Sequence, residues 1–482
     1  MNLKITAAVA ATLACSAPAF ASNLATTISP QVKLVTSGAS AARDSFLVLM
    51  ANSACQAGTF DMYRIAPTAN QDFRAYSCTI VNDAASFGSA ANKTATVYYR
   101  SEGGAAWGPV PIATNTQVTR LAVDLNCTTT STASIAGVAG TFVVHDCVAP
   151  AGDFVLVGTN STDADKSATN NAHFAKDVVQ LGVSDEEPKM FGPPNFPSSH
   201  VFDTFAGNKQ GVLNTLNGSA QVGFGQVFGV VVNTNTGAPG NGVSTPVNSP
   251  FIGLTGAQIS LGKSTLAGIF NGTYRNWADV PTSTGGRVSA SSLTIRICRR
   301  EPGSGTQVAA NQYFLGTVQC QPSPIGGFRT DGADADDAAT AFFQDTDGVI
   351  ERGATGDLLN CVQGLAGGIG FATYTTSPPA GTAFIGIDGQ TPDRNKAAAG
   401  QYGFVFEQTF QINATGDAAA LAQGLVTSSQ ISTSAPNTAS VVSLPNENND
   451  FFGQGPFVTT SPPIAYGTRG GNSCSPIAPV TP

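Results

Sequence analysis

Charged side chains are scarce in this chain of 482 residues. Asp, Glu, Lys and Arg together make up 11% of the sequence, and 31 acidic residues against 23 basic ones give a net charge of −8. This acidic balance argues against a nucleic acid or an anionic membrane surface as partner, because either would repel the protein. It does not exclude a small anion, which backbone dipoles and one arginine can hold whatever the net charge.

Several signatures of enzymes and metal sites are also missing. Neither a CxxC pair nor a GxSxG nucleophile motif occurs, and Ser304 lies in a GSGT stretch with no identifiable base. The histidines without metal-ligand spacing are His145, His173 and His200. The acidic run without EF-hand spacing, interpreted as a solvated loop, is Asp331, Asp334, Asp336 and Asp337. The sequence therefore predicts no enzyme, no metal site and no cofactor.

A long apolar run is present only at the start of the chain. Residues 1–21 carry one early positive charge and an apolar stretch from Ile5 to Ala14, and they end in the small-x-small pattern Ala19-Phe20-Ala21. We therefore expect a signal peptide cleaved after Ala21 and a periplasmic or secreted mature chain. A lipoprotein that begins at Cys15 is the alternative. No later segment is apolar for about eighteen consecutive residues, so no stable membrane insertion is expected.

The cysteine count fits an oxidising compartment. Nine cysteines less Cys15 of the leader leave eight, and an even number in an exported chain favours disulfides. Proximity along the sequence favours three pairs and leaves a fourth: Cys55–Cys78, Cys127–Cys147, Cys298–Cys320 and Cys361–Cys474.

The remaining pattern is that of an α/β protein, because short strand patterns alternate with helical ones. The 225–233 run is almost continuously apolar, as expected for a parallel strand buried on both faces. Residues from about 105 to 178 indicate a β-rich insertion, and the tail from about 450 is expected to lie extended on the surface. Other strands are predicted at 32–35, 96–100, 177–183 and 293–298, and helices at 41–50, 261–280 and 309–314.

Several of these strands end in Ser, Thr and Gly where a helix begins. A helix N-terminus has unpaired N–H groups and a partial positive charge, so it receives anions. The group at 300–306 adds Arg300, whose planar fork suits a tetrahedral oxyanion. Taken alone, each turn also fits an ordinary helix cap, and Arg300 also fits a surface arginine.

Six segments, in order, resemble the phosphate-binding periplasmic protein of ABC transporters. The fourth of them carries the family's spacing of Ile269, Phe270, Gly272, Trp277 and Asp279. The six are residues 36–46 (TSGASAARDSF), 98–104 (YYRSEGG), 182–188 (GVSDEEP), 261–280 (LGKSTLAGIFNGTYRNWADV), 300–306 (REPGSGT) and 367–374 (GGIGFATY).

The resemblance implies a two-lobe fold of the periplasmic-binding-protein type II kind, with a β-rich, disulfide-bearing insertion in the first lobe. The chain would cross between the lobes twice, so a ligand would lie in the cleft and closure would be a hinge motion. The implied divisions are lobe one at 30–233 and 390–460, lobe two at 234–389, and an extended C-terminal tail at 461–482.

The resemblance also implies the ligand-binding positions. Arg300 would fork onto the anion, and Asp185 would accept the proton of a monohydrogen phosphate, which would select against fully ionised sulfate. A helix cap is the alternative role for Asp185. The full set is Ser40, Ser101, Asp185, Arg300, Ser304, Gly305 and Thr306.

The chain departs from the family in three places. Pro302 stands where the family has an acidic residue beside the arginine, Ala42-Arg43 replaces a Thr-aromatic pair, and the insertion has no counterpart. The function predicted is a monomeric, exported protein that captures phosphate or a similar oxyanion for ABC-type import, with a transporter permease as partner. The alternatives are a secreted anion-scavenging or phosphate-ester-cleaving protein on this fold, and a surface or adhesion protein with a vestigial cleft.

Overall fold

A computed structural model describes residues 27–66, 72–148, 174–191, 209–316, 320, 348–430, 441–442 and 466–480. Within these ranges, residues 126, 128, 136, 137, 139, 236, 237, 241, 242, 283, 301, 302, 376, 399, 470, 471 and 477 are left out. The predicted leader, His173, His200, Pro302 and the acidic run at 331–337 therefore lie outside the described residues. Of the helices in the described ranges, none has the length and apolar character to cross a membrane.

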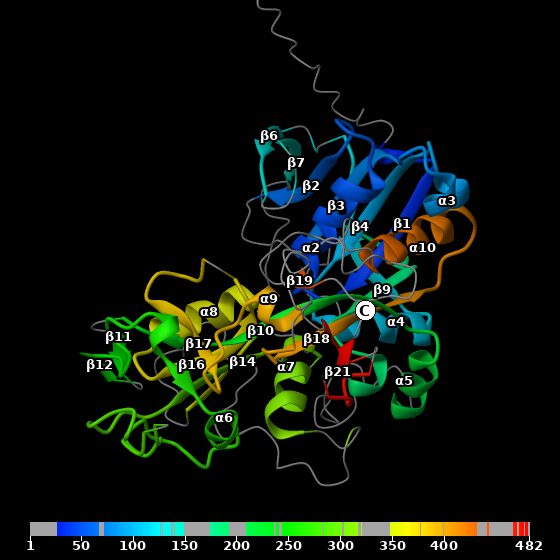
Figure 1. The fold of residues 1–482 in the computed structure, drawn as a ribbon. Helices are drawn as coiled ribbons and strands as arrows, with labels where there is room; N and C mark the ends of the chain where they lie inside the picture. The colour runs from blue at the N-terminus through cyan, green and yellow to red at the C-terminus, as the bar shows by residue number, and fades with distance from the viewer. Residues whose placement is uncertain are drawn as a thin grey trace, which may run out of the picture.

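One mixed sheet of 15 strands runs through the molecule, and the fold is α/β as the sequence predicts (Figure 1). Branching from its main path are β13 (Ser260–Leu261), β17 (Thr382–Ile387) and β19 (Val441–Val442). The main path, in spatial order, is β15 (Val349–Arg352), β14 (Arg296–Arg300), β16 (Gly368–Thr373), β10 (Gln221–Asn233), β18 (Val405–Ile412), β9 (Leu181–Ser184), β1 (Val32–Gly38), β4 (Thr94–Arg100), β3 (Phe73–Thr79), β2 (Asp61–Ala66), β7 (Phe142–Val148) and β6 (Thr129–Ala133).

Short helices cover the sheet. The 15-residue α10 buries Ala418, Leu421, Ala422 and Leu425, whose spacing of three and four residues places them on one helical face. The helices are α2 (Arg43–Leu49), α3 (Ala84–Phe87), α4 (Pro109–Thr114), α5 (Lys209–Asn217), α6 (Lys263–Phe270), α7 (Gly305–Ala310), α8 (Thr355–Gly364), α9 (Arg394–Ala398) and α10 (Gly416–Gln430), with π-helical turns η1 (Met50–Ala54) after α2 and η7 (Asn311–Leu315) after α7.

Two large hydrophobic cores lie on the two parts of this sheet. The first contains Leu34, Phe46 and Leu421, between the β1 end of the sheet and helices α2 and α10. The second contains Leu266 and Phe371, between the β16 end and helix α6. Figure 1 shows the elements of the first core in blue and orange above those of the second in green and yellow. We call these the first and second cores below.

Two strands, β10 and β18, run from one core into the other. Phe224 and Phe410 pack in the first core, whereas Val227 and Phe406 pack in the second. The expectation of a parallel strand at 225–233 is wrong, because β10 is antiparallel to β16, β17, β18 and β19. An apolar run reports burial on both faces and carries no information about strand direction.

The predicted helix at 261–280 is shorter than expected. Helix α6 ends at Phe270, and Gly272 then adopts a φ of +83°, a left-handed conformation that turns the chain. Trp277 lies beyond the turn in the second core, where its indole N–H donates to the carbonyl of Gly367 at 3.1 Å. The apolar signature therefore spans a helix and a separate buried turn.

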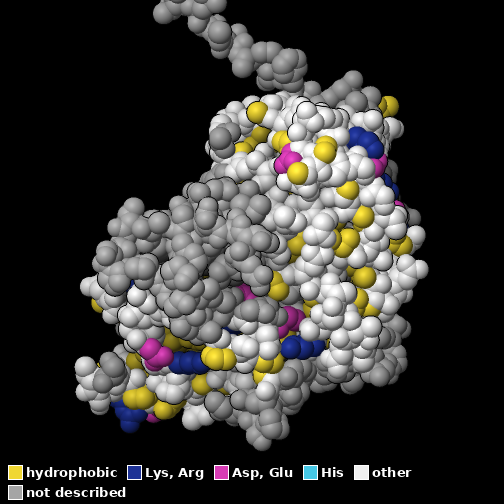
Figure 2. Space-filling view, turned by 45° about the vertical axis from the view of Figure 1, so that its right-hand side comes forward, with side chains coloured by type: hydrophobic (Ala, Val, Ile, Leu, Met, Phe, Trp, Pro, Cys, Tyr) yellow, Lys and Arg dark blue, Asp and Glu magenta, His cyan; other side chains and the backbone are white. Residues whose placement is uncertain are grey.

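The β-rich insertion is joined to the main sheet. Strand β7 pairs in parallel with β2, and β6 pairs with β7, so part of the insertion extends the edge of the first core. The other part is a separate two-stranded sheet of β5 (Gln117–Leu121) and β8 (Phe174–Val178). Among the described residues on the face in Figure 2, the charged side chains are scattered and of both signs.

Four disulfides join the eight cysteines beyond the leader. Cys55–Cys78 and Cys127–Cys147 are confirmed. The other two predicted pairs are wrong, because the structure pairs Cys298 with Cys361 and Cys320 with Cys474. Cys298 of β14 and Cys361 of α8 are buried in one small apolar cluster, so the helix that packs on the strand decides the pairing and sequence proximity does not.

The last described segment is fixed to the body of the protein. It begins with β20 (Tyr466–Thr468) and ends with β21 (Ala478–Val480), which pair antiparallel. Ser473 is 2% exposed and Cys474 is bonded to Cys320. The expectation of a surface-lying tail is therefore wrong for this part of the chain.

The disulfide pattern gives a first prediction. A thiol assay on the denatured, unreduced mature protein should find no free thiol, because all eight cysteines are paired. Mass spectrometry of an unreduced digest should find peptides joined through Cys298–Cys361 and Cys320–Cys474. Linked peptides joining Cys298 to Cys320 would contradict this pairing.

Candidate functional site

Turns from both cores meet where the sheet passes from one core to the other. The turn after β4 contacts the turn after β14, since the N–H of Ala106 donates to the carbonyl of Gly303 at 3.0 Å. Ala41, in the turn after β1, packs against the second core, while Val308 of α7 packs in the first. The two cores are therefore interlocked at these turns.

A glycine is required at position 305, where the chain contacts Asp185. A Cβ atom on Gly305 would lie 2.5 Å from both the Cβ and the Oδ2 of Asp185, closer than side chains approach. Gly305 begins α7, and Asp185 directly follows β9. The missing side chain at Gly305 thus lets the Asp185 carboxyl lie directly against the turn at 303–305.

Arg300, the last residue of β14, is buried at this meeting point with an exposure of 1%. Its Nε donates to the carbonyl of Arg352 at 3.2 Å, and its Nη2 donates to the carbonyl of Gly353. Its Nη1 donates to two hydroxyls, Thr355 at 3.1 Å and Ser40 at 3.5 Å. The turn between β15 and α8, with the first residue of α8, therefore supplies most of the groups that orient the guanidinium.

Of the hydroxyl residues predicted from the sequence, Ser304 and Thr306 lie close to Arg300 along the chain, and Ser40 lies close to it in space. Ser304 and Thr306 are each 1% exposed, and Thr306 Oγ1 makes no hydrogen bond with any described residue. Ser40 accepts from Arg300 across the junction. Ser101 differs, because its N–H and its hydroxyl donate to the carbonyl and the carboxylate of Asp72, both at 2.8 Å.

Asp185 is 2% exposed, and the Nε2 of Gln408 donates to its Oδ1 at 3.4 Å. Burial raises the pKa of Asp185 to about 7, and the positive charge of Arg300 opposes the rise. The carboxyl is therefore able to exchange a proton near neutral pH, unlike a solvated aspartate. An aspartate that only capped a helix at the surface would not have this property.

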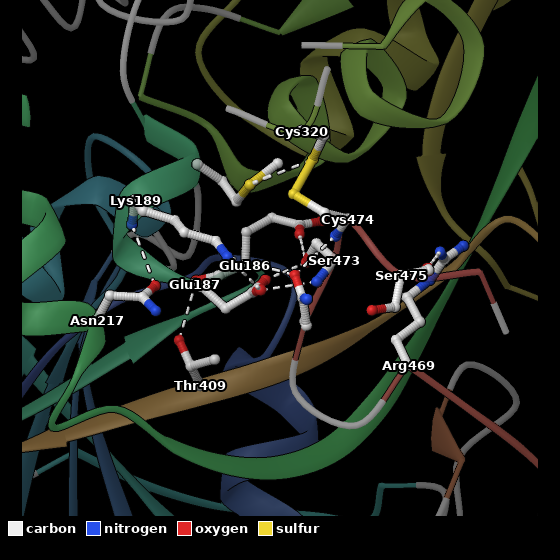
Figure 3. A network of polar contacts seen from close by, with 12 residues as sticks. Glu186, Glu187, Lys189, Asn217, Cys320, Thr409, Arg469, Ser473, Cys474 and Ser475 are labelled. Carbon is white, nitrogen blue, oxygen red and sulfur yellow. Dashed lines mark hydrogen bonds and ion pairs between the residues drawn. A yellow bond between two sulfur atoms is a disulfide. The ribbon is translucent and has the colours of Figure 1, made fainter. Parts of the chain in front are cut away.

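The two residues after Asp185 form a second buried acidic group with the C-terminal segment (Figure 3). The carboxyls of Glu186 and Glu187 both contact the hydroxyl of Ser473, and the N–H of Ser473 donates to Glu187 at 2.6 Å. A hydroxyl has one hydrogen, so it can donate to one carboxylate only. The other carboxyl must carry a proton, and burial together with Glu187 raises the pKa of Glu186 well above its usual range.

No catalytic or metal constellation is found among the described residues. His145 contacts Asp61 at 3.2 Å and stacks on Tyr63, which places it in the first core away from Arg300. No group of three or more His, Cys, Asp or Glu side chains in the described ranges is arranged to hold a metal ion.

Sequence reasoning missed three polar residues at the junction. Thr355 opens α8 after a strand and a small-residue turn, the same pattern that identified Ser304, so a signal for it existed. Asp72 and Gln408 lie within a strand ladder or next to one, and nothing in their local sequence distinguishes them. Their proximity to the site follows from how distant strands pair.

No protein-family model matches the chain, and no curated protein matches it. Solved structures with a distant likeness include PfluDING, described as a high affinity periplasmic phosphate-binding protein bound with phosphate, at 12% identity over 70% of this chain and 89% of that chain (TM-score 0.35). PstS from Borrelia burgdorferi matches at 13% identity over 56% and 80% (TM-score 0.31). A phosphate-binding protein from Stenotrophomonas maltophilia matches at 14% over 55% and 71% (TM-score 0.28). At these TM-scores the function is inferred from the geometry of this chain alone.

The raised pKa of Asp185 predicts a pH-dependent stability. The folded protein retains this proton up to about pH 7 and the unfolded chain releases it near 3.8, so the stabilisation is complete below about pH 4 and is lost as the pH rises toward 7. The difference corresponds to about 4 kcal/mol. Asp185→Asn, which stays neutral, should therefore gain stability relative to the wild type as the pH rises, measured by urea unfolding in phosphate-free buffer.

Asp83→Asn is the control for this measurement. Asp83 caps α3, and hydrogen bonds to its carboxylate lower its pKa from 3.8, so its titration ends below about pH 4. This variant should follow the wild type between about pH 5 and pH 8. Parallel profiles for the wild type and Asp185→Asn would mean that Asp185 is ionised in the folded protein.

Proposed function

We propose that this chain binds phosphate, or a similar tetrahedral oxyanion, at the junction of the two cores and performs no covalent chemistry on it. The observation that carries the proposal is the buried guanidinium of Arg300, which hydroxyls approach from both sides of the junction. A buried arginine attracts an oxyanion through its charge, and the low local dielectric strengthens that attraction.

The neighbouring donors support the same ligand. Thr306 has a buried hydroxyl that no described residue engages, and Ser304 is buried at the start of the same helix. A tetrahedral oxyanion has four oxygens that need several donors, and Ser40, Gly305 and the adjacent N–H groups supplement Arg300. Ser101 completes the proposed set if its present partner, Asp72, gives way.

Asp185 supports phosphate over other oxyanions. An ionised carboxylate next to an anion repels it, unless a proton lies between them. Phosphate keeps one proton at neutral pH, whereas sulfate has none. With a pKa of about 7, Asp185 is suited to share a proton with such a ligand, and above that pH its ionised carboxylate would act as the element that rejects sulfate.

We further propose that the mature protein acts in the periplasm or outside the cell, where it delivers the anion to an ABC importer. The leader at 1–21 supports export, and four disulfides suit an oxidising compartment. Capture between two lobes that close like a hinge suits a transport receptor, and a monomer suffices for it.

Removal of the guanidinium tests the proposal directly. Arg300→Ala should weaken phosphate binding by about 2–4 kcal/mol, which is roughly 30- to 1000-fold in Kd, because a buried charge-assisted pair is lost. Isothermal titration calorimetry of the mature protein measures it. Arg287→Ala is the matched control, since Arg287 is an exposed arginine on a distant turn.

An unchanged Kd in Arg300→Ala would remove Arg300 from the site. Hydrolysis of a phosphate ester by the purified wild-type protein, lost in Arg300→Ala, would replace binding by the ester-cleaving alternative. Absence of any heat with phosphate, arsenate, sulfate and molybdate would contradict the proposed function itself.

Asp185 gives a separate test of selectivity. At about pH 8, above the pKa of about 7 of Asp185, the wild type should bind phosphate and ignore sulfate, because the ionised carboxylate has no ligand proton to accept from sulfate. Asp185→Asn keeps the size of the side chain but turns an obligate acceptor into a possible donor, so this variant should bind sulfate measurably. Competition of sulfate against phosphate in both proteins measures it, and equal binding of the two anions by the wild type would exclude the carboxylate from the site.

A further inference from the structure

Asp72 already occupies donors at the edge of the first core. It directly precedes β3, whose first residue Phe73 lies opposite Arg100 of β4, so Ser101 comes to lie beside Asp72. The hydroxyl of Ser101 donates to Asp72 Oδ1 at 2.8 Å, and Nη1 of Arg43 donates to the same oxygen at 3.2 Å. One carboxylate oxygen thus receives a charged donor and a hydroxyl donor, as an oxyanion ligand would.

The two donors belong to the two first-core turns that face the junction. Arg43 opens α2 in the turn after β1, and Ser101 opens the turn after β4. Nε of Arg43 is buried and makes no hydrogen bond with a described residue, and it lies 3.8 Å from a carboxylate oxygen of Asp44 in an ion pair. These groups form an anion-binding set that is complete without any group of the second core.

Asp72 also acts on the Arg300 side of the junction. Asp357 lies in the first turn of α8, where the charge of Arg300 lowers its pKa and the charge of Asp72 raises it, against a background of burial. Asp72 is therefore within electrostatic reach of the groups that surround Arg300. Its side chain is 26% exposed, so water reaches the carboxylate and its displacement needs no unfolding of the core.

We propose that Asp72 is a tethered carboxylate that occupies an anion subsite made by Arg43 and Ser101, so that an external anion must displace it to use these donors. The identity of that external anion rests on the proposed function, but the existence of the subsite does not. A tethered group competes at a high effective concentration, so it weakens every external anion that uses the same donors. The Asp72 carboxylate therefore raises the concentration of external anion at which the first-core turns take part in binding.

Removal of the tether should strengthen binding of inorganic phosphate. Asp72→Ala should lower the Kd for phosphate about ten-fold or more, since the freed donors add a charge-assisted contact. Asp72→Asn keeps an acceptor oxygen and loses the charge, so it should fall between the wild type and Asp72→Ala. Because asparagine has nearly the same shape, it also keeps the comparison valid if the alanine variant folds poorly.

Asp146→Asn is the matched control for charge. Asp146 pairs with Arg64 at 2.6 Å on the β2–β7 edge of the same core, and its side chain is 18% exposed. The Asp146→Asn substitution removes one negative charge from the first core, at a position that does not contact Arg43 or Ser101. A ten-fold gain in this variant too would assign the effect to net charge and overturn the subsite.

Acetate gives a readout that needs no phosphate binding. In Asp72→Ala, acetate should raise the melting temperature along a saturable curve, because it replaces the missing carboxylate between Arg43 and Ser101. The wild type and Asp146→Asn should show no such saturation. If the acetate response appears and no protein binds phosphate, the subsite stands and the proposed function fails. If the wild type binds phosphate and Asp72→Ala shows neither tighter binding nor an acetate response, the function stands and this inference is wrong.

Discussion

The positive charge of Arg300 is buried where the two cores meet, and a buried charge is stable only when other groups replace the water that it has lost. The carbonyls of Arg352 and Gly353, the hydroxyls of Thr355 and Ser40, and the charge of Asp185 do so. Arg300 ends β14, and these groups come from the residue after β9, from the end of β15 and the start of α8, and from the turn after β1. The cost of leaving the guanidinium unsolvated therefore keeps four distant segments together, and the contacts of Gly305 and Ala106 across the junction depend on that meeting.

Three carboxyl groups lie near two guanidinium groups at the junction. Asp72, Asp185 and Asp357 lie within electrostatic reach of Arg43 or Arg300, so the field there is a balance and no open basic cleft results. In such a balance, one proton more or less on a ligand changes the interaction as much as one hydrogen bond does. A net charge of −8 is therefore compatible with the proposed anion site, whose selectivity would depend on the protonation of the ligand.

The sequence predicts those parts of the site that local signals encode. Arg300 and Ser304 lie where a strand leads into a turn with small residues, whereas Asp185 is expected from the family resemblance alone. The structure brings the three together at one junction. The sequence does not predict the partners of these residues. Asp72 and Gln408 come to the site because strands that are far apart along the chain pair with one another. The same reason explains why two predictions about the fold were wrong. The direction of β10 and the pairing of Cys298 with Cys361 both depend on which distant elements pack together. An apolar pattern does not encode that choice.

The C-terminal segment contacts both cores. Arg469 donates to the carbonyls of Gly403 and Val405 beside the second core, whereas Ser473 contacts the carboxyls of Glu186 and Glu187, which follow β9 of the first. The segment therefore joins the two cores in addition to β10 and β18. The disulfide Cys320–Cys474 fixes the middle of the segment.

The contact of Ser473 requires a proton on one of two adjacent carboxyls, those of Glu186 and Glu187. The other charged groups that face this pair are Lys189, Arg469 and Asp185. Since the raised pKa of Glu186 favours the protonated pair at low pH, the end on the first core is the one that weakens as the pH rises.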